Sequence, residues 1–273
     1  MVTDLPNLIE LGLLLLAVGA LAGLLAGLLG VGGGIVLVPA LSFTFTALGY
    51  ASSGLMQICI ATSLASIVFT SMRSMAAHHK KGAVDWGILK SWAPGIVVGA
   101  IVGVLTAASL SSTVLQGIFG GLALIVGTYL LFGRIEWRLK DNMPVGPMRT
   151  VDSSLIGFLS VLMGIGGGSF GVPFMTLHGV AIHRAVATAA GFGLLIAFPS
   201  MIGFLFVPVA VHPPFTIGAV NLPALLIIIS MTLLTTPLGA RLAHVTDAKR
   251  LKRIFGVFLI LVAANMIRKS IGW

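Results

Sequence analysis

Charged residues are scarce in this chain. They make up 8% of its 273 residues, against about 25% in ordinary soluble domains. Acidic residues are the rarest, with a total of 7, and none lies in the middle of an apolar stretch, since Asp85 and Asp152 stand at the starts of such stretches. This absence argues against a proton relay built from carboxylates and fits a path for anions.

Cysteine is almost absent as well. The single Cys59 excludes an intramolecular disulfide framework and a metal cluster built on several thiolates. We therefore expect no metal site and no cofactor.

Long apolar runs are abundant. Hydrophobic residues make up 58% of the chain, and the runs approach or exceed the roughly 18 residues that mark a candidate membrane helix. They predict an all-α polytopic protein that lies in a lipid bilayer. The runs fall near residues 8–29, 31–49, 54–77, 86–108, 113–133, 153–179, 185–210, 218–242 and 252–268.

The net charge of +9 raises the question of nucleic-acid binding, but its distribution argues otherwise. The basic residues lie in short loops between apolar runs, which is the positive-inside pattern of a membrane protein. We therefore expect no nucleic-acid partner. The loop residues are Lys80, Lys81, Arg134, Arg138, Lys140, Arg149, Lys249, Arg250, Lys252 and Arg253.

A glycine cluster occurs twice inside this apolar sequence. Residues 30–34 read GVGGG and are followed by Pro39, and residues 164–168 read GIGGG and are followed by Pro173. Each glycine costs about 1 kcal/mol in a helix interior relative to alanine, so each cluster predicts a break in a helix. Paired breaks in the two halves of a membrane protein indicate a transported substrate.

The clusters belong to a longer duplication. Ala61-Thr62 matches Ala187-Thr188, and both pairs follow their glycine cluster. The positions of basic and uncharged loops are exchanged between the halves, which predicts inverted topology. We expect two inverted-topology repeats, each with a glycine-broken re-entrant or discontinuous helical hairpin plus transmembrane helices. The predicted parts are a first membrane repeat over 1–133, a cytoplasmic linker over 134–151 and a second membrane repeat over 152–273.

Other glycines recur every four residues. Such ridges of small residues allow close helix packing in lipid, and that is the role we predict for them. Exposed ridges would also permit a homodimer. The two ridges are Gly19, Gly23 and Gly27, and Gly95, Gly99 and Gly103.

A helix that restarts after either cluster would offer unpaired N–H groups and the positive end of its dipole to a small anionic substrate. Nearby hydroxyls and amides could add donors, although such groups also bond to their own backbone or to a neighbouring helix. The candidate substrate-binding residues of this group are Gly32, Gly33, Gly34, Ser42, Gln57, Thr62, Ser63, Gly166, Gly167, Gly168, Ser169 and Thr188.

Two further candidates, His183 and Arg184, begin the helix after the second cluster. Arg184 could pair with an anionic substrate or extend to the membrane surface. If a proton is the coupling ion, a histidine such as His178 or His183 is the candidate, because it titrates near neutral pH. A Ser169/His183 pair leaves an intramembrane hydrolase open as an alternative.

The two G-x-G-G-G-x4-P motifs, each followed by Ala-Thr, resemble the sulfite exporter TauE/SafE family of membrane permeases. The resemblance covers the chain from about Ala17 to Ile267. It implies a multi-pass protein of the bacterial inner membrane that moves sulfite, sulfoacetate or other organosulfonates. We expect a secondary transporter working by alternating access, not an enzyme, with an anion channel as the alternative.

Overall fold

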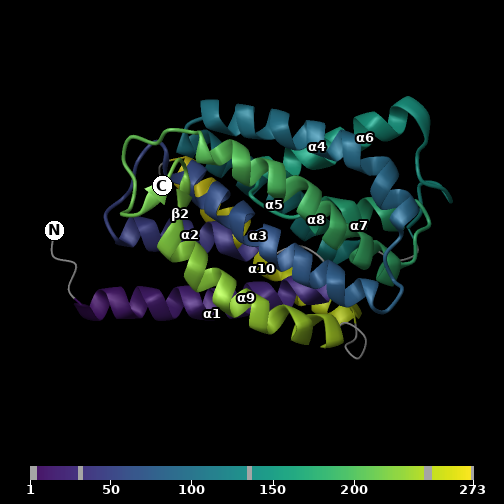
Figure 1. Ribbon diagram of the computed structural model, residues 1–273, viewed down its shortest axis with the longest axis horizontal. Helices are drawn as coiled ribbons and strands as arrows, with labels where there is room; N and C mark the ends of the chain where they lie inside the picture. Colours follow the sequence, from purple (N-terminus) through teal and green to yellow (C-terminus); the bar gives the residue numbers. More distant parts are fainter. Residues whose placement is uncertain (1–4, 30–32, 134–136, 243–247, 272–273) are drawn as a thin grey trace.

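A computed structural model describes residues 5–29, 33–133, 137–242 and 248–271, and it is helical almost throughout (Figure 1). These residues form ten helices and one short antiparallel hairpin of β1 (Thr216–Ile217) and β2 (Val220–Asn221). The helices are α1 (Leu5–Leu29), α2 (Gly34–Ala47), α3 (Leu55–His79), α4 (Trp86–Ser109), α5 (Ser112–Phe132), α6 (Gly146–Leu162), α7 (Gly168–Leu177), α8 (Ile182–Leu205), α9 (Leu222–Leu242) and α10 (Ala248–Ser270).

The helices suit a bilayer in length and composition. Five stretches among the described residues are long and apolar enough to cross it, namely α3, α4, α5, α8 and Leu222–Gly239 of α9. Large apolar side chains also cover the outside of the bundle, where lipid rather than water can solvate them. The predicted all-α polytopic membrane protein is therefore confirmed. Examples of these exposed side chains are Leu105, Ile125, Leu226, Leu234 and Leu261.

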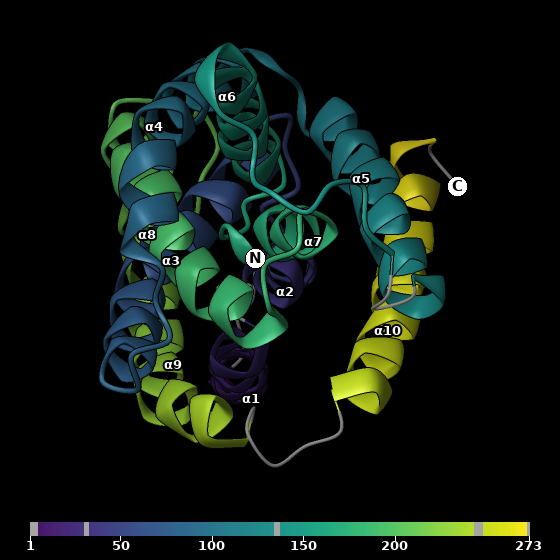
Figure 2. The same cartoon turned by 90° about the vertical axis from the view of Figure 1, so that its right-hand side faces the viewer.

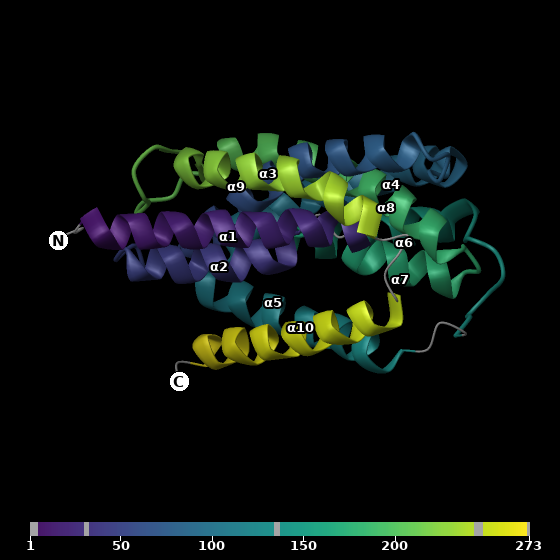
Figure 3. The same ribbon diagram turned by 90° about the horizontal axis from the view of Figure 1, so that it is seen from below.

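Helices α3 and α8 form the centre of the bundle. The most apolar window of α3 is 89% buried and that of α8 is 67% buried, whereas those of α4, α5 and α9 are at most 44% buried. The two helices pack against each other. In addition, α8 packs on α4 and α3 packs on α9. The outer helices pair across the two halves of the chain, with α1 along α9, α6 along α4 and α5 along α10 (Figures 2 and 3).

The glycines of the predicted ridges lie at the contacts between these paired helices. A methyl group on Gly19 would lie 3.2 Å from the Met231 side chain, and one on Gly23 would lie 2.6 Å from the Thr232 backbone, both on α9. On α4, a methyl group on Gly103 would lie 2.8 Å from Val161 of α6. Side chains there would push the helices apart, so the predicted packing role is confirmed.

The two ends of the bundle differ in charge. We call the end formed by loops 80–85, 137–145 and 178–181 the basic end, because its loops carry Lys80, Lys81, Arg138 and Lys140. At the opposite end lie loops 48–54, 110–111 and 206–221, which contain no Lys, Arg, Asp or Glu. We call it the neutral end after these loops, although α10 also ends there with Arg268 and Lys269 in its last turn (Figure 1, left). The positive-inside rule predicts that the basic end faces the cytoplasm.

The predicted helix breaks at both glycine clusters are confirmed. In the second cluster, Gly164 has φ +63° and ends α6. The Ile165 N–H donates to Ser160 O and the Gly164 N–H to Val161 O, which is a Schellman motif. In the first cluster, α1 ends at Leu29 and α2 begins at Gly34, after Gly33 at φ +76°. Residues 30–32, including the candidate Gly32, lie outside the described residues.

Each break forms a hairpin that opens toward one end. The hairpin of α6 and α7 opens to the basic end, where Leu139 N–H donates to Leu177 O over 2.8 Å. The hairpin of α1 and α2 opens to the neutral end, so α2 and α7 lie toward opposite ends of the bundle (Figures 1 and 3). Viewed along the bundle, α2 and α7 lie one behind the other near its centre (Figure 2).

The linker is shorter than the predicted range 134–151, since α6 already begins at Gly146. Pro147 lies in the first turn of α6, where its fixed φ and missing N–H suit a helix start. The division into two repeats stays a prediction.

Replacing Gly99 by alanine tests the packing of α4 on α6. The added methyl group would overlap the Ser154 carbonyl, with 2.7 Å to its carbon, whereas Gly121 on α5 has no atom within 4 Å of a methyl group. Because overpacking costs about 1–3 kcal/mol, we expect Gly99→Ala to lower the melting temperature of the detergent-solubilised protein. Gly121→Ala should leave the melting temperature unchanged or raise it. Equal melting temperatures for the two variants would contradict the packing role.

Candidate functional site

The two glycine clusters touch each other in the interior of the protein. A methyl group on Gly34, the first residue of α2, would overlap Gly164 O and lie 2.8 Å from the Ile165 Cα. The hydroxyl of Ser63, on α3, donates to the same Gly164 O over 2.7 Å. Gly34, Ser63 and Gly164 are all buried. The structure therefore brings three predicted features together: both helix breaks and one hydroxyl.

Helices α2 and α7 each start at one of the glycine clusters without a capping side chain. The residues before them are Gly33 and Gly167, which have no side-chain oxygen to accept from the first N–H groups. The first residues of both helices, Gly34 and Gly168, are buried, so water does not replace the missing cap. Uncapped helix starts of this kind present N–H donors and the positive end of the helix dipole. The arrangement suits a small anion.

The hairpins also carry hydroxyls that have no partner. Among the described residues, the buried hydroxyls without a hydrogen bond are those of Ser42, Thr44, Ser74, Ser160 and Ser169, and all but Ser74 lie on α2, α6 or α7. An unsatisfied buried donor costs about 1–3 kcal/mol, so native proteins rarely keep one without a use for it. Sequence reasoning singled out Ser42 and Ser169 and missed Thr44 and Ser160.

Thr62 and Thr188 occupy equivalent positions, and the hydroxyls of both bond to residues outside the glycine contact. The Thr62 hydroxyl accepts from the Asn221 N–H over 3.0 Å, and the Thr188 hydroxyl accepts from the Asp85 N–H over 2.9 Å. Asn221 accepts from the Ala224 N–H, and Asp85 accepts from the Ile88 N–H. Each threonine thus holds the capping residue of a helix in the other half of the chain.

His183 and Arg184 lie on the exposed surface at the basic end. The Arg184 guanidinium pairs with Asp85, with 2.8 Å between Nη2 and Oδ2. The arginine is 59% exposed and the aspartate 23%, so the anionic partner of Arg184 in this structure is a protein carboxylate. His178 is buried at the end of α7, where its Nδ1 donates to Phe174 O over 2.8 Å.

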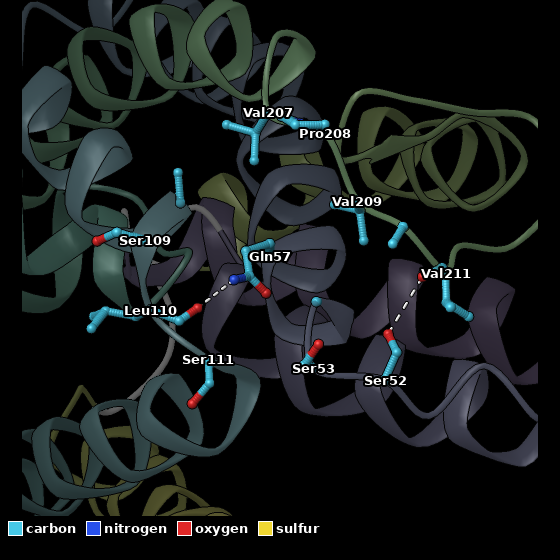
Figure 4. Close-up of a pocket in the computed structure, with 13 residues that line it drawn as sticks. Ser52, Ser53, Gln57, Ser109, Leu110, Ser111, Val207, Pro208, Val209 and Val211 are labelled. Atoms are coloured by element: carbon cyan, nitrogen blue, oxygen red, sulfur yellow. Dashed lines mark hydrogen bonds between the residues drawn. The ribbon is translucent and has the colours of Figure 1, made fainter.

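Gln57 lies near the neutral end, in a cavity formed by three loops (Figure 4). Its Nε2 donates to the backbone oxygen of Leu110, and its Oε1 has no partner. Gln57 and Arg184 therefore lie at opposite ends of the bundle and do not belong to one site.

The Ser169/His183 pair required by a hydrolase is not formed in this structure. Ser169 is buried at the start of α7 and its hydroxyl has no hydrogen-bond partner, while His183 is exposed at the start of α8. In the described part of the chain, no group of three His, Cys, Asp or Glu side chains could hold a metal ion. The chemistry available at the glycine contact is hydrogen bonding to an anion.

Comparisons with known proteins agree with a transport role. A family model described as "Sulfite exporter TauE/SafE" matches residues 15–266. A probable membrane transporter protein of Haemophilus influenzae is 34% identical over 259 residues, which cover 94% of this chain and 98% of the relative. Probable membrane transporter proteins of Methanocaldococcus jannaschii and Bacillus subtilis are 26% and 27% identical and cover 91% and 94% of this chain, and 95% and 98% of the relatives. No solved structure matches the chain in the same comparison.

These relatives are described as transporters, and the similarity extends over nearly their full length. This points to a role that is not enzymatic. The helical fold, with its five candidate spans, fits the multi-pass membrane location that such a role requires and is consistent with a bacterial inner membrane. The match of the family model to most of the sequence then decides the classification: this chain belongs to the sulfite exporter TauE/SafE family of membrane transporters.

Proposed function

We propose that the protein is a secondary transporter that carries small sulfur-containing anions, such as sulfite, sulfoacetate or other organosulfonates, by alternating access. The observation that carries the proposal is the buried contact between Gly34 and the cluster at Gly164. Helices α2 and α7 start uncapped at these two clusters, with unpartnered hydroxyls on the same hairpins. Sulfur as the substrate element comes from the family description.

The residues at the hairpins favour an anion over a cation. In the four helices of the two hairpins, Asp and Glu occur only near helix starts, as Glu10 in α1 and Asp152 in α6. Helix starts and hydroxyls donate hydrogen bonds without carrying a permanent charge. An anion held by such donors is bound weakly enough to leave again, which a carrier needs.

Several observations support inverted repeats as the basis of alternating access. The two hairpins open toward opposite ends, and the pairing of α1 with α9 mirrors the pairing of α6 with α4. Thr62 and Thr188 make equivalent bonds to the opposite half. Rocking of one half against the other would then expose the glycine contact to each side in turn.

The ends also differ in a way that suits a gate. At the basic end, Arg184 and Asp85 join α8 to α4 through their ion pair. At the neutral end, the corresponding positions are Ile58 and Asn221, which cannot form an ion pair. We infer that the ion pair holds the basic end closed. The neutral end instead contains the cavity lined by Gln57.

Radiolabelled sulfite flux into proteoliposomes tests the function. We expect saturable uptake that is lost in Gly34→Ala, because the added methyl group overlaps Gly164 O. The Gly34→Ala protein must keep its elution profile on size exclusion for the result to count. Absence of saturable flux for sulfite and for organosulfonates, with folded protein, would refute the proposal. Unitary currents without saturation would favour an anion channel.

Ser169→Ala separates substrate binding from packing. The hydroxyl has no protein partner to lose, so we expect the melting temperature to stay the same or rise. A lost hydrogen bond to a charged group is worth about 1.5–3 kcal/mol, so KM for sulfite should rise about tenfold or more. Ser200→Ala is the matched control, because the Ser200 hydroxyl donates within its own helix to Ile196 O. An unchanged KM in Ser169→Ala would remove Ser169 from the site, and full activity of the same variant would remove the hydrolase.

Asp85→Asn tests the gate, since asparagine keeps the helix cap and removes the charge. The readout is maleimide labelling of a cysteine introduced at Ser71, a buried position on α3, in a protein whose Cys59 is changed to alanine. Labelling in inside-out vesicles reports access from the basic end. An exposed ion pair is worth about 0.2–1 kcal/mol, so labelling should be roughly two- to fivefold faster. Arg138→Gln, which breaks an exposed pair with Asp141, should leave the labelling rate unchanged. Equal rates in all variants would contradict a gate at Asp85.

A further inference from the structure

We propose that the cavity at the neutral end is a second binding site, separate from the glycine contact, for a small ligand that carries its own N–H or O–H donor. The inference rests on the proposed function only for the choice of sulfonates as probes. It does not require the two halves of the protein to move.

The cavity is built by three loops that are tied together. It measures about 360 Å³, and residues 52–54, 57, 108–111 and 207–211 line it (Figure 4). The Ser112 N–H donates to Ser53 O over 2.8 Å, and the Ser52 hydroxyl donates to Val211 O over 3.4 Å. The volume lies within the range of small-molecule sites, and the hydrogen bonds hold the walls in place without a ligand.

Gln57 gives the cavity its polarity. The side chain is 6% exposed. Figure 4 shows Nε2 directed at the backbone oxygen of Leu110, with Oε1 on the other side of the amide. This Oε1 is buried and has no hydrogen-bond partner. Because an amide oxygen only accepts hydrogen bonds, a ligand that completes this site must bring a donor.

Helix ends of both kinds meet at the cavity. Helices α3 and α5 begin there after Gly54 and Ser111. Helix α4 ends there at Ser109, so its negative dipole end opposes their positive ends. None of the residues that line the cavity is Asp, Glu, Lys, Arg or His, so its polar contacts come from hydroxyls, the Gln57 amide and the backbone.

Together these features define the ligand class. A fully deprotonated anion such as sulfate has only acceptors, so it would leave Gln57 Oε1 without a partner. A hydroxyalkyl- or aminoalkylsulfonate, or a protonated oxyanion, offers a donor to Oε1. Gln57 precedes Ser63 by six residues, which is about 9 Å along α3, so an occupant would lie between the neutral end and the glycine contact.

Two sulfonates that differ in one hydroxyl test the site. Calorimetry would measure the binding of 2-hydroxyethanesulfonate and of ethanesulfonate to the purified protein in nanodiscs. We expect the hydroxylated anion to bind about tenfold more tightly, as one added hydrogen bond allows. In Gln57→Met, which keeps the length of the side chain and removes the acceptor, the two Kd values should become equal. Ethanesulfonate itself should bind within about twofold of its wild-type affinity, since it does not use Oε1.

The buried Ser200→Ala variant, which does not line the cavity, should keep the tenfold preference. Equal affinities in the wild-type protein would overturn the proposal, and so would a preference that survives in Gln57→Met. If Gln57→Met does not fold, Gln57→Leu takes its place under the same criteria. A preference in binding together with no sulfonate flux would refute the transport function and leave this site standing.

Discussion

Backbone-to-backbone contact between the two glycine clusters is the constraint on which the rest of the structure depends. Gly34 lies against Gly164 and Ile165 so closely that no side chain fits between them, and Ser63 of the central helix α3 bonds to the same carbonyl. This contact sets how deep both hairpins reach. It also holds the start of α2 in the interior, while Gly167, before α7, packs closely on Phe192 and Gly193 of α8.

The two ends of the bundle share a backbone plan but differ in chemistry. A threonine holds the capping residue of a neighbouring helix at each end, yet the cap is Asp85 with Arg184 at the basic end and Asn221 at the neutral end. Gln57 at the neutral end corresponds in the duplication to His183 at the basic end. Under the proposed mechanism, these differences make the two ends energetically unequal and give the carrier a resting orientation.

Much of the fold could be predicted from the sequence, because membrane helices and glycine breaks are local features. The breaks at both clusters and the packing of the glycine ridges are confirmed. The roles of Thr62 and Thr188 could not be predicted, because their partners are 159 and 103 residues away. The unpartnered hydroxyls of Thr44 and Ser160 were missed, since serine and threonine in apolar helices often bond to their own helix, as Thr70 and Ser200 do. The Gln57 cavity needs three loops from distant parts of the chain and has no local signal.

Locating a bound anion tests the central claim most directly. Selenite has the shape and charge of sulfite, and selenium gives an anomalous signal in X-ray diffraction. The account predicts an anomalous peak within hydrogen-bonding reach of the starts of α2 and α7, beside Ser169. A peak found only elsewhere, with the helix starts at Gly34 and Gly168 closed on each other and no anion between them, would contradict it.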